Sequence, residues 1–221
     1  MPNNNDNTFF QVALLKQFSK YIEGSDYSKE ILQIAKNYYQ ESIVLNKFDA
    51  HEFPHEDNSK DVIIIFEAIY YLNSFKKFIN ECKRVLRKNG ILLIATANKD
   101  LYDFNPSPFT YKYYGVTELN SILRKNGFET NCYGHLSTYS VSIIQKLLRP
   151  IKKIAINLNI VPKSMTAKKI LKKIVFGGLV SLPHEIKEGM LDFKKPKKLC
   201  DSEPNKEFKV ILCEAKLFNQ D

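Results

Sequence analysis

The chain has 221 residues, of which 44% are hydrophobic, and it carries a formal net charge of +9 at pH 7. This length and apolar content favour one globular domain with an insertion over two domains. No apolar stretch approaches the about 20 uncharged residues that cross a bilayer, so the sequence predicts no membrane span. Four widely spaced cysteines and the lack of a signal peptide predict reduced thiols in the cytoplasm.

The positive charge is concentrated in one segment. Between Thr130 and His184 there is no Asp or Glu, whereas nine Lys and Arg residues occur there. The rest of the chain carries equal numbers of basic and acidic residues. We therefore interpret the segment as a basic insertion rather than as the sign of a generally basic nucleic-acid-binding protein.

Helical and strand patterns alternate along the chain. Apolar spacing predicts helices at Gln11–Lys20, from an N-cap at Ser28, from Phe75 to a glycine-terminated end at Asn89–Gly90, and at Thr117–Asn126. Short apolar runs predict strands at Tyr21–Ser25, Ser42–Phe48, Val62–Phe66, Ile91–Ala97, Phe128–Tyr133 and Phe208–Phe218. Such alternation is typical of an α/β fold with a doubly wound, mostly parallel sheet, because parallel strands need helical crossovers.

Four segments follow one another in an informative order. They are Ser25–Ser28, Asp49–Pro54, Asp61–Glu67 and Arg84–Gly90, the last of which leads into Ile91–Ile94. Together they resemble the adenosylmethionine-binding half of class I methyltransferases of the methyltransferase type 11 kind. The resemblance implies a Rossmann-like fold whose final strand is antiparallel, and S-adenosylmethionine as the cofactor.

The resemblance assigns six residues to the cofactor. Asp26, with the neighbouring Tyr27, would contact the ribose hydroxyls, and Asp49 and Ala50 the adenine. Phe66 and Glu67 would lie beside the methionine part. Each carboxylate also has an ordinary interpretation, since Asp26 can cap the next helix, Asp49 can be a turn residue and Glu67 can cap a turn.

The segment after the fifth strand of the family is also informative. Ala97–Asp100, Asp103–Pro108 and Tyr113–Tyr114 resemble methyltransferases found among bacterial polysaccharide and glycolipid genes. There the loop covers the acceptor side of the pocket, and its Tyr and Asn side chains suit a sugar-like acceptor. An ordinary surface loop is the alternative.

The chain departs from the family at its start. Asn3–Asn7 stand where the family has a glycine-rich turn, and the first strand is expected to be absent. That turn brings backbone amides against the cofactor carboxylate, which glycine alone permits at little strain. The departure leaves two interpretations open: an active methyltransferase, or a non-catalytic, truncated module that pairs with another chain or an anionic surface.

The predicted organisation is a core over residues 1–138, a basic helical cap and loop over 139–206, and the final core strand over 207–221. The cap would fold over the acceptor pocket, or lie on an anionic membrane at the inner membrane surface. Nucleic acid is disfavoured because aromatic residues do not interleave with the lysines.

No metal site is expected, and no catalytic residue is assigned, because methyl transfer depends chiefly on alignment of the reactants. His184 and Glu185 could be a catalytic base and its orienting partner, but a surface turn is the simpler interpretation.

Overall fold

The computed structural model describes residues 19, 21–39, 43–139, 149–151, 153–154, 158 and 193–218. The chain divides into two compact units, one formed by residues 1–49 and 160–193 and the other by residues 50–159 and 194–221. Each unit is described by itself. The predicted helix at Gln11–Lys20, the start of the chain and most of the basic insertion lie outside the described residues, and the predicted boundaries at 138 and 206 stay predictions.

The first unit contains a strand–helix–strand motif. Strand β1 (Glu23–Ser25) and strand β2 (Val44–Asn46) pair in parallel, and helix α2 (Lys29–Tyr39) connects them. The buried face of α2 packs with the strands through a small apolar cluster, whose members are Leu32, Ala35, Tyr39, Ile43 and Leu45. The three predicted elements of this region are therefore confirmed, with both strands shorter than expected.

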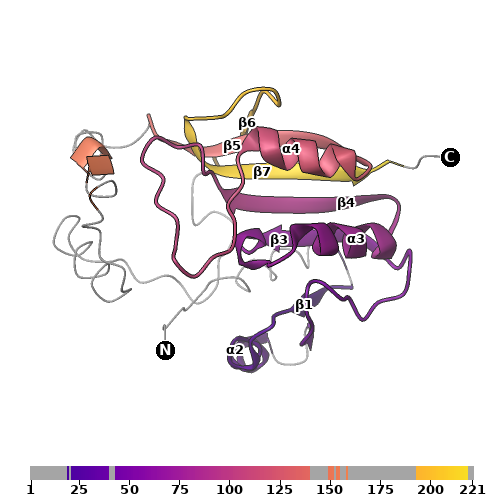
Figure 1. Cartoon of the computed structure of the whole chain (residues 1–221). Helices are drawn as coiled ribbons and strands as arrows, with labels where there is room; N and C mark the ends of the chain where they lie inside the picture. Colours follow the sequence, from indigo (N-terminus) through magenta and orange to yellow (C-terminus); the bar gives the residue numbers. More distant parts are fainter. Residues whose placement is uncertain are drawn as a thin grey trace. The chain divides into compact units, whose positions relative to one another are not determined.

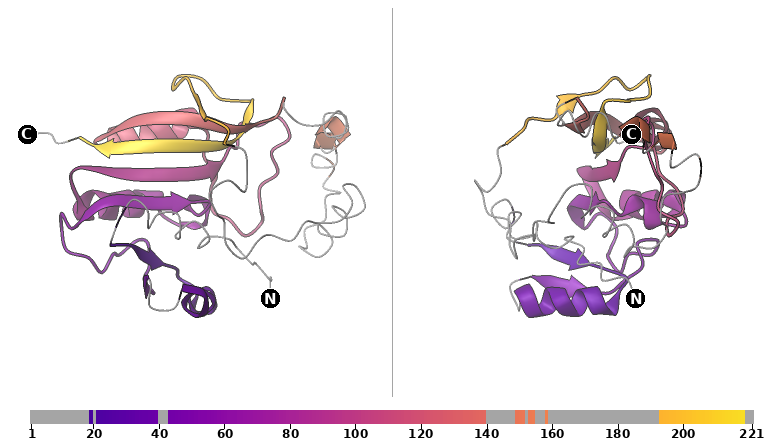
Figure 2. Two further views of the ribbon diagram at one scale, coloured as in Figure 1. Left: turned by 180° about the vertical axis from the view of Figure 1, so that it is seen from behind. Right: turned by 90° about the vertical axis from the view of Figure 1, so that its left-hand side faces the viewer.

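The second unit is a five-stranded sheet in the order β3-β4-β7-β5-β6 (Figure 1). Its strands are β3 (Lys60–Phe66), β4 (Leu86–Ala97), β5 (Phe128–Ser137), β6 (Lys197–Lys198) and β7 (Phe208–Leu217). A 3-10 turn (Ile69–Tyr71), helix α3 (Phe75–Val85) and helix α4 (Val116–Lys125) complete the unit. Both helices lie on the same face of the sheet, as Figures 1 and 2 show.

The sheet of the second unit is mixed rather than mostly parallel. Strand β3 pairs with β4 in parallel, whereas β7 is antiparallel to both of its neighbours, β4 and β5. The antiparallel direction of the final strand confirms the prediction. Because β7 lies between β4 and β5, these two strands have no direct ladder with each other, and antiparallel ladders predominate in this unit.

The core of the second unit lies between the sheet and its two helices. Ile79, Leu119 and Ile211 each have 0% of their surface exposed and come from α3, α4 and β7. The helix α3 begins at Ser74, whose hydroxyl accepts a hydrogen bond from the backbone N–H of Lys77. Burial of large apolar side chains in this layer fixes the helices, and thereby the loops at the ends of the strands.

The end of α3 differs from the prediction. The helix ends at Val85, and Asn89, not Gly90, has the left-handed conformation, with a φ of 63°. Gly90 is required for a different reason. A Cβ atom there would lie 2.8 Å from the carbonyl oxygen of Arg87 and 2.9 Å from the Leu86 side chain. Asparagine tolerates a positive φ better than most residues, whereas no side chain fits at residue 90.

Candidate cofactor and acceptor site

The first unit places two predicted site residues after paired strands. Asp26 directly follows β1, and Asp49 comes three residues after β2. The two strands are parallel, with Ser25 opposite Asn46, so their carboxyl ends meet at one edge. The ammonium group of Lys47 lies over the ring of Tyr27, 5.1 Å from its centroid. The segments that follow β1 and β2 are therefore in contact.

Asp26 also has the capping role that its position allows. Its Oδ1 accepts a hydrogen bond of 2.8 Å from the backbone N–H of Ser28, and the Ser28 hydroxyl accepts one from the N–H of Ile31. These contacts stabilise the start of α2. A carboxylate has two oxygens with several acceptor positions, so capping and a ribose contact are compatible. Tyr27 has 72% of its surface exposed, which leaves its ring accessible to a ligand.

Ala50 begins the loop that leads through the second unit to β3. Ala50 and Phe53 are partly buried and pack against the core of that unit. The Phe53 ring meets the Phe78 ring of α3 edge to face, with 6.0 Å between centroids. The loop is therefore anchored to α3 within a few residues of the predicted adenine contact.

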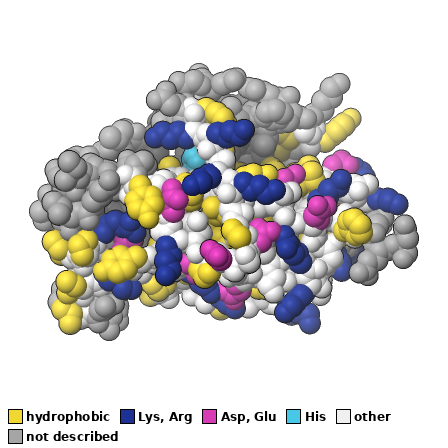
Figure 3. Space-filling model, turned by 90° about the horizontal axis from the view of Figure 1, so that it is seen from above, with side chains coloured by type: hydrophobic (Ala, Val, Ile, Leu, Met, Phe, Trp, Pro, Cys, Tyr) yellow, Lys and Arg dark blue, Asp and Glu magenta, His cyan; other side chains and the backbone are white. Residues whose placement is uncertain are grey.

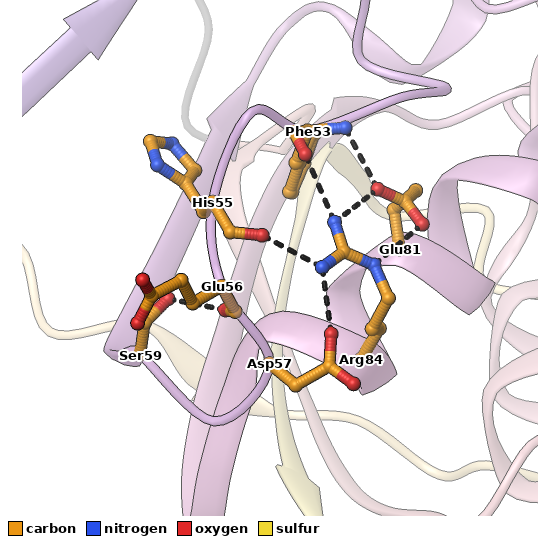
Figure 4. A network of polar contacts seen from close by, with 7 residues as sticks. All are labelled: Phe53, His55, Glu56, Asp57, Ser59, Glu81 and Arg84. Carbon is orange, nitrogen blue, oxygen red and sulfur yellow. Dashed lines mark hydrogen bonds and ion pairs between the residues drawn. The ribbon is translucent and has the colours of Figure 1, made fainter.

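Polar contacts from α3 hold the same loop (Figure 4). The guanidinium group of Arg84 donates to the backbone carbonyls of Phe53 and His55, and to the carboxylate of Asp57 at 2.8 Å. It also forms two hydrogen bonds with Glu81, of 2.7 and 3.0 Å. Glu81 in turn accepts from the backbone N–H of Phe53 at 2.7 Å. Hydrogen bonding to Arg84 keeps the pKa of Glu81 below its ordinary value.

Glu67 lies immediately after β3 in a strained conformation. Its φ is 52°, and its backbone N–H donates to the carbonyl of Ala95 in β4 at 2.7 Å. Its Oε2 accepts a 2.9 Å hydrogen bond from the hydroxyl of Tyr70. Partial burial raises the pKa of Glu67, while the Tyr70 hydrogen bond opposes that shift. Left-handed non-glycine residues are uncommon and concentrate at functional sites.

The other predicted contact in β3 is Phe66. It is half-buried and lies opposite Ala95 in the parallel ladder with β4. The structure therefore brings Phe66 and Glu67 together at the carboxyl end of β3. The 3-10 turn that follows receives no side-chain capping bond at Ala68, so the Glu67 carboxylate is used by Tyr70 rather than by the turn's N-terminus.

Aromatic rings gather beside the Glu67 carboxylate. The ring of Tyr70 stacks on Tyr113 from the loop after β4, with centroids 4.6 Å apart, and Phe104 meets Tyr113 edge to face at 4.9 Å. The N–H of Tyr111 donates to the carbonyl of Tyr70 at 2.8 Å. Burial, followed by the charge of Glu67, raises the pKa of Tyr70 well above its ordinary value, so its hydroxyl stays protonated.

The loop after β4 also presents aromatic side chains to solvent. Tyr71 of the neighbouring 3-10 turn and three residues of the loop are 47–71% exposed, the loop residues being Tyr102, Phe109 and Tyr111. The loop's base is fixed by Asn98, which is fully buried and donates to the carbonyl groups of Asn205 and Phe208. The base is thus ordered by hydrogen bonds while the aromatic rings remain accessible.

Two contacts join the basic insertion to this loop. Arg149 forms an ion pair of 2.6 Å with Asp103, which is only 8% exposed. Lys153 lies over the ring of Tyr102, 5.7 Å from its centroid. The two residues of each contact are more than 40 positions apart, so no local sequence pattern predicts these contacts. Local sequence likewise does not predict the contact between Tyr70 in the 3-10 turn and Tyr113 in the loop after β4.

Other chemistry is not supported by the residues that the structure describes. Among them, no three His, Cys, Asp or Glu residues are placed to hold a metal ion. Within the same residues, no helix is long and apolar enough to cross a membrane. His184 and Glu185 lie outside the described part of the chain. A shallow hollow lined by Arg124, Gly127 and Phe218 lies at the opposite ends of the strands from Glu67.

Comparison with known proteins supports the resemblance. Residues 8–94 match the methyltransferase domain of the methyltransferase 11 family. A probable S-adenosylmethionine-dependent methyltransferase of Mycolicibacterium smegmatis is 28% identical over 120 residues, which cover 52% of this chain and 46% of that protein. A malonyl-[acyl-carrier protein] O-methyltransferase of Buchnera aphidicola is 27% identical over 171 residues, or 68% of each chain.

The fold has relatives among solved structures. The crystal structure of YcgJ from Bacillus subtilis matches with a TM-score of 0.56 at 15% identity, over 94% of this chain and 87% of that one. All six residues assigned to the cofactor fall within the segment that matches the family. The chain spans less than half the length of the M. smegmatis relative. Over residues 8–94 this chain is therefore similar to class I S-adenosylmethionine-dependent methyltransferases, and its α/β fold is like that of the solved methyltransferase-like structure.

Proposed function

We propose that this protein transfers a methyl group from S-adenosylmethionine to a hydroxyl or similar nucleophile of a small acceptor, which is sugar-containing or lipid-linked. One observation carries the proposal. Residues of the homologous segment that follow the carboxyl ends of β1, β2 and β3 are those that the cofactor assignment requires, namely Asp26, Asp49 and Glu67. In open α/β sheets, ligands bind outside the carboxyl ends of the strands.

The residues fit different parts of the cofactor. The carboxylates of Asp26 and Asp49 would accept hydrogen bonds from the ribose hydroxyls and the adenine amino group. Tyr27 and Ala50 would lie against the nucleoside. Phe66 would form an apolar wall, and the Glu67 carboxylate, which is held by Tyr70, would pair with the ammonium group. The bound cofactor would supply an electrophilic methyl group on sulfur.

The transfer itself makes few demands on side chains. A bond forms between the acceptor oxygen and the methyl carbon while the sulfur–methyl bond breaks, the electron pair stays on sulfur, and the acceptor proton passes to solvent. Holding the reacting atoms in line supplies most of the rate enhancement in such a step. Tyr70, Tyr113 and the ordered loop after β4 would hold the acceptor in line with the methyl group, and no residue is assigned as a catalytic base.

The acceptor class is inferred from the exposed rings. Tyr71, Tyr102, Phe109 and Tyr111 offer ring faces and hydroxyl groups to a sugar ring or an acyl chain. The helical residues Ile151 and Ile154 are 61% and 58% exposed beside Lys153, which supports contact with an anionic membrane that holds a lipid-linked acceptor. Increased binding to vesicles with anionic lipid, weakened by salt, would support that contact.

A binding experiment tests the cofactor proposal. Calorimetric titration with S-adenosylhomocysteine should show binding that weakens at least tenfold in D26N, D49N and E67Q, because each removes a charged acceptor. Asp61→Asn is the matched control, since Asp61 is exposed and pairs only with the surface residue Arg87 among the contacts described. Absence of binding at millimolar ligand, or equal losses in D61N, would refute the proposal.

The alternative function is a non-catalytic module that pairs with another chain. In the described part of the structure, β3 forms a ladder only with β4, and Val62 on its apolar run is 48% exposed. An apolar edge strand of this kind favours further pairing. Measurement of mass in solution distinguishes the two, because a folded monomer that binds S-adenosylhomocysteine contradicts this alternative.

The described residues of the face shown in Figure 3 do not favour a nucleic-acid partner. In the view of Figure 3, Lys and Arg side chains are interspersed with Asp and Glu side chains. Among the described residues of the second unit, Arg124 pairs with Asp201 and Lys197 with Glu207. A nucleic-acid surface is usually a continuous basic patch or stripe, which the described residues of this face do not provide.

A further inference from the structure

Besides the ring contact between Phe53 and Phe78, a pair of charged side chains fastens the loop between Ala50 and Ser59 to α3. Arg84 has five N–H donors, and the structure gives the guanidinium five hydrogen bonds: two to Glu81, one to Asp57 and two to backbone carbonyls. Glu81 accepts from the N–H of Phe53, and Arg84 donates to the carbonyl of the same residue. Both backbone groups of Phe53 are therefore fixed by one bidentate ion pair.

This arrangement is more than a surface salt bridge. The exposed fractions of the Arg84 and Glu81 side chains are 32% and 19%, whereas those of Arg87 and Asp61, a pair in the same unit, are 49% and 76%. The Arg84 fork also joins three loop positions at once, Phe53, His55 and Asp57, as Figure 4 shows. A planar guanidinium holds several acceptors in a fixed geometry, which a lysine cannot reproduce.

The position of the clamped segment gives the pair its role. Phe53 lies three residues after Ala50, and Asp49 precedes Ala50 in the chain. We propose that Arg84, together with Glu81, is a positioning residue for base recognition, which holds the 50–57 loop in the shape that reads adenine. The inference rests on the proposed function, because it takes Asp49 and Ala50 as the adenine contacts. Neither Arg84 nor Glu81 is assigned a contact with the cofactor.

The test compares two ligands that differ only in the base. S-inosylhomocysteine has a carbonyl group in place of the adenine amino group, so it cannot donate the hydrogen bond expected at Asp49. We expect the unmutated chain to prefer S-adenosylhomocysteine by roughly tenfold, the value of one good hydrogen bond. In Arg84→Lys, that preference should fall at least threefold, because the loop loses its fork. Loss of overall stability alone would weaken both ligands equally and leave the ratio unchanged.

Two further variants make the result specific. Arg87→Lys is the matched control and should keep the preference, because Arg87 holds only the exposed Asp61 among the partners described. Glu81→Gln keeps the shape of the side chain and should lose the preference as Arg84→Lys does, which provides a second route if the lysine variant does not fold. Hydrogen exchange at the Phe53 amide should accelerate in both clamp variants and stay unchanged in Arg87→Lys.

The outcomes separate the two proposals. If the unmutated chain binds with the expected preference, and Arg84→Lys and Glu81→Gln keep it, the positioning role is wrong and the proposed function stands. If the unmutated chain binds both ligands equally, the adenine role of the loop is overturned. If it binds neither ligand, the proposed function fails, and the role of Arg84 in base recognition fails with it.

Discussion

The hydroxyl of Tyr70 donates a hydrogen bond of 2.9 Å to the carboxylate of Glu67. The pair joins the carboxyl end of β3 to the 3-10 turn, and the Tyr70 ring carries the contact onward to Tyr113 in the loop after β4. The contact connects the two sides of the proposed site in the second unit. In the proposed site, Glu67 would lie on the cofactor side and Tyr113 on the acceptor side.

Replacing Tyr70 with Phe should raise the pKa of Glu67 further. The hydroxyl lowers that pKa in the native protein, whereas burial raises it. Stability should fall by only about 1 kcal/mol, because the ring can still stack on Tyr113. Titration of the Glu67 carboxylate by NMR checks the direction, and a pKa that falls in the variant would contradict the described hydrogen bond.

The affinity for S-adenosylhomocysteine should depend on pH through Glu67. Because the folded pKa of Glu67 is raised, its carboxylate begins to protonate at a higher pH than an ordinary glutamate does. Pairing with the ligand's ammonium group needs the ionised form, so affinity should be greatest above the raised pKa of Glu67 and decline as pH falls through that pKa. Calorimetry between pH 4.5 and 7.5 measures this decline. It should be absent in E67Q, which would bind weakly throughout.

The Glu81 and Arg84 pair should contribute to acid sensitivity. The pKa of Glu81 is lowered in the folded protein, chiefly by its hydrogen bonds to Arg84. The folded state therefore binds the proton less tightly, so the contribution is present above the unfolded pKa and is lost as pH falls through the folded one. Thermal unfolding of the native chain should show a larger loss between pH 7 and pH 3 than Glu81→Gln shows. Equal losses would contradict the contribution of this pair.

Truncation of a buried isoleucine in α3 should be costly. Ile79 has no exposed surface, so Ile79→Ala should reduce the free energy of unfolding by about 2–5 kcal/mol. Ile151→Ala is the same substitution at a position that is 61% exposed, and it should change the free energy by less than about 0.5 kcal/mol. Urea unfolding followed by circular dichroism compares the two, and similar values would contradict the described core.

Two adjacent residues near the start of β4, Asn89 and Gly90, should respond oppositely to substitution. Gly90→Ala should destabilise the fold by roughly 1 kcal/mol or more, because its Cβ would lie 2.8 Å from a backbone oxygen. Asn89→Gly should be neutral or slightly stabilising, since the residue already has a φ of 63°. The melting temperatures of the two variants check this. If both variants were destabilised equally, the assignment of the left-handed conformation to Asn89 rather than Gly90 would be contradicted.

The sequence predicted the elements whose signals are local. Ser28 as the N-cap of α2, and a strand over the apolar run from Val62 to Phe66, are both confirmed, because both depend on neighbours within a few residues. The continuous apolar run also indicates a strand covered on both faces, and this is wrong, since among the described residues β3 lies at the edge of its sheet and Val62 is 48% exposed. The antiparallel final strand came from the family resemblance. The choice between Asn89 and Gly90 failed because both residue types accept a left-handed conformation, and the Leu86 and Arg87 atoms that decide it are known only from the fold.

The contacts that sequence reasoning missed are those between distant residues. The partners of Arg84 in the loop lie 27–31 positions away, and Arg149 lies 46 positions from Asp103. Tyr70 is recognisable as important only once Tyr113 is beside it. Asp26, Tyr27 and Asp49 lie in the first unit, while Ala50, Phe66 and Glu67 lie in the second, so their convergence on one ligand remains the prediction to test.

A crystal structure of the chain with S-adenosylhomocysteine tests that convergence most directly. The account predicts one ligand molecule whose ribose hydroxyls lie within hydrogen-bond distance of Asp26, whose adenine amino group faces Asp49 and whose ammonium group contacts Glu67. A ligand bound elsewhere, or the three carboxylates directed away from a common molecule, would contradict it.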